Sequence, residues 1–281
     1  MIKNYDIYEE VVKQVVPFGN GSIVYTPKKW IGQTVRVILE GEPVNIKESV
    51  VELLQPFLEN IKGVFLYGSF ARNEQAPDSD IDVLVVADKK FKLEKKSRFD
   101  FTVIEEATLR KELKGKDPFY TYLVLQEAKP IINKALLKEL KEIKINKCDF
   151  KWLLEEAESA LKIAEEFLKL DKLQERKKLD STAIVHTIVL RLKNLFWLQC
   201  ILKNEKYSNK EFKSFLHKKG LPKELIEKFY DLYRAERDEK GTPVKVSVED
   251  TEKLYEVAKR ELIEMREVLH KCLQKRKHSK E

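Results

Sequence analysis

Residues 64–86 read VFLYGSFARNEQAPDSDIDVLVV, and this stretch decides the fold class of the middle of the chain. An apolar run leads directly into Gly68-Ser69, a polar loop follows, and a second apolar run begins at Asp80-Ile81-Asp82. Short apolar runs bounded by Gly, Pro and Asp are typical of buried β-strands. The order predicts two strands of one sheet, with polar side chains gathered where the first strand ends and the second begins.

Three aspartates in and beyond this stretch form a candidate metal site. Residues two apart in a strand project to the same side, so we expect Asp80 and Asp82 to point together while Ile81 packs. Asp100 lies between two phenylalanines in the next apolar run, where a lone charge is costly. Carboxylates held side by side repel one another unless a cation joins them, and oxygen-only ligands favour Mg²⁺ or Mn²⁺. The pattern therefore predicts a divalent-metal site.

The Gly-Ser pair is a candidate phosphate site. Gly68 and Ser69 fall where a strand enters a helical turn, and there backbone N–H groups and a serine hydroxyl can hold phosphate oxygens. Each feature has a structural alternative, because a lone Gly-Ser or Asp-x-Asp recurs by chance and Asp100 could pair with Arg98 or Arg72. The occurrence of these features together and in this order favours a functional site.

This arrangement resembles the nucleotidyltransferase superfamily that includes DNA polymerase β, kanamycin nucleotidyltransferase and, closest in pattern, the minimal nucleotidyltransferases of prokaryotes. The family signature combines Gly-Ser, an Arg-Gly pair and Ser-Asp-x-Asp. Here Asn73 replaces the second glycine, and asparagine is the non-glycine residue that best tolerates a left-handed φ. The family's nucleotide and metal residues match Gly68, Ser69, Arg72 and Ser79 for the nucleotide, and Asp80, Asp82 and Asp100 for metal binding and catalysis.

The resemblance implies a metal-dependent nucleotidyltransferase. It would transfer a nucleoside monophosphate, with AMP from the co-substrate ATP as first expectation, to an acceptor hydroxyl and release pyrophosphate. Mg²⁺ or Mn²⁺ would be the cofactor. A small molecule, a protein and RNA all remain open as the acceptor.

Composition and patterning divide the chain into parts. An α/β (α+β) domain with a mixed sheet is expected in the middle, preceded by a small β module and followed by an all-α helical bundle. The expected ranges are 1–42 for the β module, 43–146 for the nucleotidyltransferase domain, 147–272 for the bundle and 273–281 for a basic tail.

Several elements can be placed from local signals. Residues 45–63 have helical spacing and should end at Gly63, and further helices are expected at 105–114 and 118–127, with a short strand at 130–132. The bundle should contain about five helices, of which the one over Asp180 to Leu202 is almost apolar all round and should be central. Hydroxyl caps are expected at two serines, Ser208 and Ser247.

The bundle resembles HEPN and substrate-binding bundles, although it lacks the Arg and His spacing of the ribonuclease members. Four residues at helical spacing are candidate acceptor contacts, with ordinary helix packing as the alternative: Tyr230, Tyr233, Arg234 and Arg237. His186 lies in an apolar helix and is expected to be a core histidine rather than a catalyst.

The N-terminal segment resembles small archaeal β modules of the AbrB type. Gly19-Asn20-Gly21 should form its tight turn, and Pro27 should open a helical turn that holds Trp30. The resemblance implies a homodimerisation module or DNA binding through residues 1–40, where Lys13, Lys28, Lys29 and Arg36 would form a basic face.

Charge and cysteine usage limit the class of protein. The formal net charge of +7 favours anionic partners but mostly describes a solvated surface, because 54 basic residues stand against 47 acidic ones. The three cysteines lack metal or disulfide-framework spacing, and no apolar run approaches the length of a membrane span. A cytoplasmic protein without a membrane partner is expected.

Two functions from other classes compete with the enzyme. One is an antitoxin-like or DNA-binding regulator, whose nucleotidyltransferase domain modifies or covers a partner protein. The other is a catalytically silent scaffold, against which the intact set of three acids argues.

Overall fold

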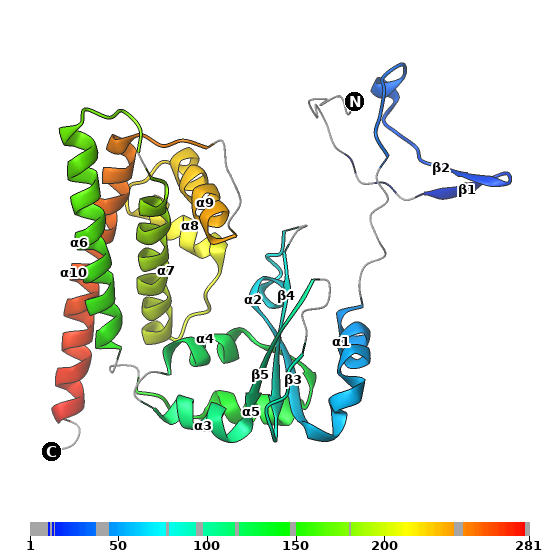
Figure 1. Cartoon of the computed structure of the whole chain (residues 1–281), viewed down its shortest axis with the longest axis horizontal. Helices are drawn as coiled ribbons and strands as arrows, with labels where there is room; N and C mark the ends of the chain where they lie inside the picture. The colour runs from blue at the N-terminus through cyan, green and yellow to red at the C-terminus, as the bar shows by residue number, and fades with distance from the viewer. Residues whose placement is uncertain are drawn as a thin grey trace. The chain divides into compact units, whose positions relative to one another are not determined.

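The computed structural model describes residues 11, 13, 15–37, 45–76, 79–93, 98–115, 118–146, 150–179, 181–238 and 244–278. The chain divides into two compact units, residues 1–52 and 53–281 (Figure 1). Each unit is described by itself.

The first unit contains a β-hairpin. Strands β1 (Val16–Phe18) and β2 (Gly21–Ile23) pair antiparallel, and Gly19 supplies the positive φ of +58° that the two-residue turn requires. Pro27 precedes the short helix η1 (Lys28–Trp30), as the sequence predicts. Residues 34–37, expected to continue the β module, are not in a strand, and 38–40 lie outside the described residues.

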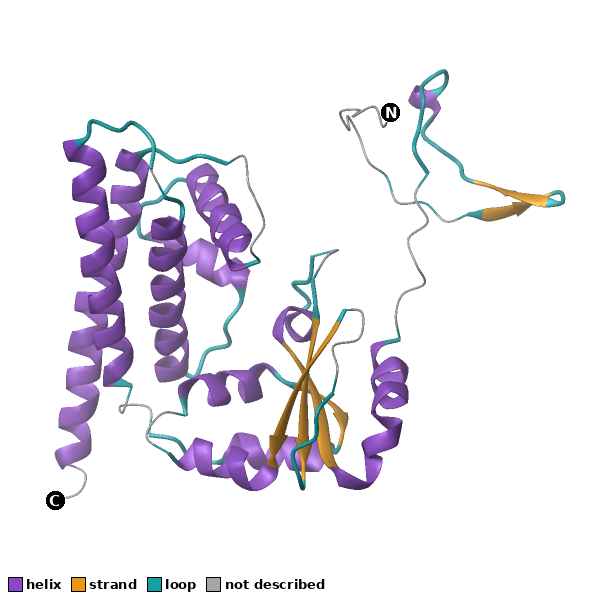
Figure 2. Cartoon of the chain, in the orientation of Figure 1, coloured by secondary structure: helices purple, strands orange, loops and turns teal. Residues whose placement is uncertain are grey.

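A mixed four-stranded sheet organises the second unit (Figure 2). Its order is β5-β4-β3-β6, in which β3 runs antiparallel to both β4 and β6 while β4 and β5 are parallel. The strands are β3 (Ile61–Tyr67), β4 (Ile81–Ala87), β5 (Phe99–Glu105) and β6 (Lys129–Ile132). The mixed sheet confirms the fold class expected for this domain.

Helices pack on this sheet and supply its apolar core. Buried leucines of α3, α4 and α5 meet Phe65, Leu84 and Val86 of the two central strands. The helices are α2 (Gly68–Arg72), α3 (Glu106–Lys114), α4 (Phe119–Glu127) and α5 (Lys134–Glu142). The expected helices at 105–114 and 118–127 and the strand at 130–132 are thus confirmed.

The helix expected to run to Gly63 ends earlier. Helix α1 spans Ile46–Leu54 and is followed by the 3₁₀ segment η2 (Gln55–Asn60). Pro56 explains the break, because proline lacks the N–H that an α-helix interior needs and restrains the residue before it. Gly63 belongs to β3 instead, where an added Cβ atom would lie 2.7 Å from the ring of Phe65.

Five helices follow in the described part of the bundle, as expected: α6 (Lys151–Leu173), α7 (Ala183–Lys203), α8 (Asn209–Lys218), α9 (Lys223–Arg237) and α10 (Val248–His278). Ser208 and Ser247 cap α8 and α10 through hydrogen bonds of 3.0 Å to backbone N–H groups, which confirms both predicted caps. Helix α7 is apolar and long enough to cross a membrane, but most of it is buried in the bundle core, which gives a central helix the same composition.

The C-terminal helix differs from expectation in two respects. Helix α10 continues to His278 and so includes residues expected to form a tail, since Leu, Gln, Lys and Arg favour helix and no Gly or Pro interrupts them. Cys272 in this helix is disulfide-bonded, a bond that the cysteine spacing did not indicate, whereas Cys200 is a buried free thiol.

Asn73 ends α2 in the left-handed conformation, with φ 58° and ψ 40°. A left-handed φ costs a non-glycine residue about 1–2 kcal/mol, less for asparagine. We therefore expect Asn73→Ala to lower the free energy of unfolding by about 1 kcal/mol and Asn73→Gly to leave it within ~0.5 kcal/mol of wild type, measured by urea unfolding. Equal destabilisation by both changes would instead implicate the hydrogen bond from Lys129 Nζ to the Asn73 side chain.

Candidate functional site

The turn between β3 and α2 brings the backbone against a carboxylate. Gly68 has φ +71°, and a Cβ atom added there would lie 2.0 Å from Asp82 Oδ2. Glycine is required both for this backbone conformation and for the close approach. The antiparallel pairing of Tyr67 with Asp82 sets the register that produces this contact.

Two of the three predicted acids are neighbours across the sheet. Asp82 on β4 pairs in register with Asp100 on β5, and Asp80 precedes Asp82 by two residues, so all three lie on one face. Burial, then the charges of Asp100 and Asp80, raise the pKa of Asp82 to about 6. Charges that oppose ionisation in this way are relieved by a bound cation, so the residues fit a divalent metal.

The two arginines near the acids make contacts with other groups. Arg98 donates to the Ser79 carbonyl at 2.9 Å, and Arg72 is held by Glu127 and Glu74, so the alternative that paired Asp100 with either arginine is wrong. Among the described residues, no three His, Cys, Asp or Glu side chains stand close enough to hold a metal as they are placed.

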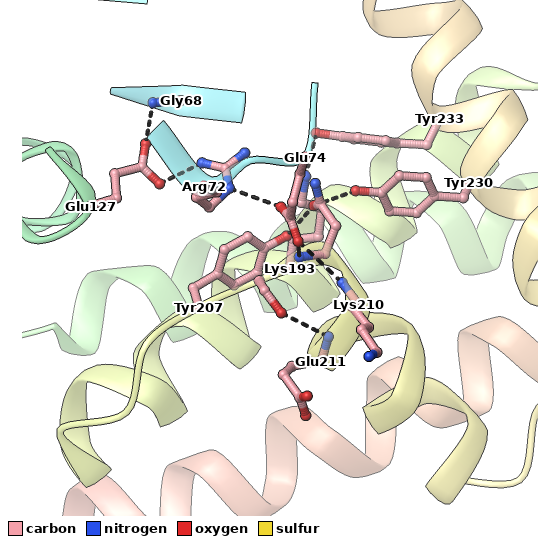
Figure 3. Close-up of polar contacts among 12 residues, drawn as sticks. Gly68, Arg72, Glu74, Glu127, Lys193, Tyr207, Lys210, Glu211, Tyr230 and Tyr233 are labelled. Atoms are coloured by element: carbon pink, nitrogen blue, oxygen red, sulfur yellow. Dashed lines mark hydrogen bonds and ion pairs between the residues drawn. The ribbon is translucent and has the colours of Figure 1, made fainter. Parts of the chain in front are cut away.

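Of the groups predicted to bind phosphate, some already form hydrogen bonds among the described residues and one does not. Gly68 N–H donates to Glu127 Oε1 at 2.7 Å, and the guanidinium of Arg72 contacts both Glu127 and Glu74 (Figure 3). Ser79 Oγ accepts from Ala76 N–H at 2.8 Å. The hydroxyl of Ser69 has no hydrogen-bond partner in the described part of the chain and remains available to a ligand.

A cleft of about 1430 Å³ lies between the sheet and the bundle. Its sheet side is lined by Gly68, Ser69, Arg72, Glu74, Ala76, Ser79, Asp80 and Asp82. Its bundle side is formed by α7, α8, α9 and the residue after α9, with many charged side chains: Lys193, Lys210, Lys213, Lys223, Glu227, Asp231, Arg234, Arg237 and Asp238. The volume exceeds the usual range of about 300–1,000 Å³ for a single small-molecule pocket.

Three of the four candidate acceptor contacts line this cleft, namely Tyr230, Arg234 and Arg237. Tyr233 does not, but its ring lies 5.2 Å from the ring of His186 in a nearly parallel stack. Burial lowers the pKa of His186, which is partly buried and is not among the fully buried residues of the bundle core.

Lys193 is a functional candidate that the sequence analysis missed. It is 7% exposed, lines the cleft and places its ammonium 4.6 Å from the ring centre of Tyr233 and 5.7 Å from those of Trp197 and Tyr230. Burial, then the positive charges of Arg237 and Arg72, lower its pKa to about 7. A lysine within the apolar half of α7 was the available signal.

The acids Glu127 and Glu74 were missed as well. Each is half-buried and bound to Arg72, but they lie 55 and 2 residues from it in sequence. Only Glu74, next to the Arg-Asn pair, lay within the motif, and nothing in the local pattern around Glu127 distinguishes it from a helix-surface residue.

The chain is similar in sequence to one family and to one curated protein. Residues 45–179 match the nucleotidyltransferase domain family. A curated protein of Methanocaldococcus jannaschii, which carries the provisional name of protein adenylyltransferase, is 44% identical over 51 residues, 18% of this chain and 51% of that protein. The chain thus spans about half the length of the curated relative that it matches.

Two solved structures are distant. The spectinomycin adenyltransferase of Enterococcus faecialis, crystallised with ATP and spectinomycin, is 14% identical with a TM-score of 0.44, covering 78% of this chain and 99% of that one. A nucleotidyltransferase-like protein of Exiguobacterium sibiricum is 13% identical with a TM-score of 0.34, covering 81% and 75%. The similarity of residues 45–179 to the nucleotidyltransferase domain family is therefore the more informative comparison.

The raised pKa of Asp82 predicts that its charge destabilises the metal-free protein. Above pH about 6 the ionised form opposes folding, and below the unfolded-state value both states are protonated and the penalty vanishes. We expect Asp82→Asn to raise the free energy of unfolding by roughly 1 kcal/mol at neutral pH in chelator, and by nothing measurable at acid pH. Denaturant unfolding at both pH values measures this, and a variant less stable than wild type at neutral pH would contradict it.

Proposed function

We propose that this chain, whose residues 45–179 form a nucleotidyltransferase domain, transfers a nucleoside monophosphate from a nucleoside triphosphate to an acceptor hydroxyl and releases pyrophosphate. The observation that carries the proposal is the position of the Gly68-Ser69 turn directly against Asp82 at one wall of the cleft. ATP is the preferred donor, in keeping with the adenylyltransferase name of the curated relative.

The phosphate turn, the two cleft-lining acids Asp80 and Asp82, and the neighbouring Asp100 each have a proposed task. The hydroxyl and N–H of Ser69 bind phosphate oxygens, and Gly68 permits the backbone to approach them. Asp80, Asp82 and Asp100 would hold Mg²⁺ or Mn²⁺, which would supply charge neutralisation to the triphosphate when bound. Asp100 accepts the proton of the attacking hydroxyl.

Arg72 takes an indirect part in this proposal. Its guanidinium is already held by two carboxylates, Glu127 and Glu74, so it acts on the turn rather than on the nucleotide. Ser79 likewise shapes the loop before Asp80 through its hydroxyl and carbonyl. Both residues support the site without contacting the phosphates.

The bundle wall is proposed to bind the rest of the triphosphate and the acceptor. Lys193 lies across the cleft from the acids and is the one strongly buried cation among the residues that line it, so we assign it to a phosphate. Tyr230, Arg234 and Arg237 are then left for the acceptor. A protein hydroxyl is the preferred acceptor class, because the curated relative is named for protein adenylylation.

The N-terminal unit is proposed to dimerise the protein. Several apolar side chains in it are exposed, among them Phe18 at 66% and Ile31 at 77%. Contact with a second copy of the chain would remove this apolar surface from water. DNA binding by the same unit, the regulatory alternative, is separated from dimerisation by an operator-binding assay without nucleotide.

Calorimetric titration tests the proposed donor site. We expect ATP to bind in the presence of Mg²⁺ and the double variant Asp80→Ala/Asp82→Ala to lose that binding by a factor of about 100 or more, because two metal ligands are removed. Circular dichroism should show that the variant remains folded. Unchanged binding in the variant would refute the metal assignment, and no nucleotide binding by wild type would favour the regulator or scaffold.

The lowered pKa of Lys193 predicts a pH dependence of nucleotide affinity. Lys193 is charged below pH about 7 and neutral above it, so its attraction for phosphate should weaken as the pH rises through that value. Lys193→Met should weaken ATP binding about tenfold near pH 6 and by less near pH 8. Lys203→Met, at the exposed end of the same helix, is the matched control. A difference that grows with pH would contradict the assignment.

A further inference from the structure

Glu127 connects the last turn of α4 to the phosphate-binding turn. One carboxylate oxygen, Oε1, accepts the Gly68 N–H at 2.7 Å, and the other accepts a hydrogen bond from the Arg72 guanidinium. The two side chains, Glu127 and Arg72, are only 20% and 16% exposed. At this depth a charge pair is screened little by water, so its geometry is well defined.

The connection continues from Arg72 into the bundle (Figure 3). Arg72 Nε donates to Glu74 Oε2 at 3.0 Å, and its guanidinium lies 5.6 Å from the ring centre of Tyr207. Glu74 Oε1 in turn accepts the N–H of Asn209, the first residue of α8, at 2.8 Å. A continuous series of bonds, here called the Glu127 relay, therefore runs from α4 through α2 to α8.

Glu127 reaches the turn from outside the cleft. Gly68, Arg72 and Glu74 line the cleft, whereas Glu127 does not. The carboxylate thus holds Gly68 from behind while Asp82 limits it in front, where a Cβ atom would come within 2.0 Å of Asp82 Oδ2.

We propose that Glu127 is a positioning residue for nucleotide binding, and that the Glu127 relay makes the affinity for the nucleotide depend on how α8 is seated in the bundle. The inference rests on the proposed function. Glu127 fixes the Gly68 N–H, which leaves the Ser69 hydroxyl directed to a ligand. Arg72 and Glu74 transmit the position of α8 to the same turn.

The test compares variants of Glu127 by calorimetry with Mg²⁺ and ATP and by thermal unfolding. Glu127→Ala removes both bonds and should weaken binding about tenfold. Glu127→Gln keeps an oxygen for the Gly68 N–H and should recover part of this affinity, which a role limited to stability would not produce. Should Glu127→Ala fail to fold, Glu127→Gln with a roughly threefold loss still tests the inference.

Two further variants separate the relay from general effects. Glu74→Gln should weaken ATP binding although Glu74 is not assigned to nucleotide or metal, and combined with Glu127→Gln it should give less than the sum of the two effects. The matched control is Glu106→Gln, which weakens a similar ion pair with Arg110 on α3 that is not part of the cleft lining. Glu106→Gln should leave ATP affinity unchanged.

The outcomes are distinct. Wild-type affinity in the folded Glu127 variants, or full additivity of Glu74→Gln and Glu127→Gln, would overturn the relay while leaving the proposed function intact. Absence of ATP binding by the wild-type protein itself would overturn the proposed function and the relay together.

Discussion

The Gly68 backbone lies so close to the carboxylate of Asp82 that a Cβ atom would have no room there, and the arrangement of the site depends on this contact. The pairing of Tyr67 with Asp82 sets the register between β3 and β4. This register places the turn at Gly68 next to the acids. In the parallel ladder, Asp100 then falls beside Asp82. Any residue larger than glycine, or a shift of one residue in register, would separate the phosphate turn from the acids.

The two walls of the cleft carry titratable groups of opposite charge, and burial shifts the pKa of each toward its neutral form. Burial raises the pKa of Asp82 on the sheet and lowers that of Lys193 on α7, so each group is drawn toward its neutral form. Both pKa shifts mean that the charged form of the group destabilises the folded protein when no ligand is bound. Perturbed groups that face one cleft are a common property of functional sites, and here a bound cation would restore the ionised form of Asp82 and a bound anion that of Lys193.

Local chemistry explains which features could be predicted from sequence. The turn at Gly68, the acids on one strand face and the left-handed Asn73 each depend on neighbours within a few residues, and the pattern revealed them. Glu127 and Lys193 could not be assigned in this way, because their partners lie 59 and 40 residues away in sequence and only the packing of α4 and α7 brings them together.

Helix α4 belongs to two hydrophobic cores at once. Phe119 at its start packs in the core of the bundle, whereas Leu125 near its end packs under the sheet. If the sheet and the bundle separated, this nine-residue helix would expose apolar surface whichever of the two it stayed with. Sheet and bundle should therefore unfold in one cooperative transition, and we do not expect the sheet to fold apart from the helices that follow it.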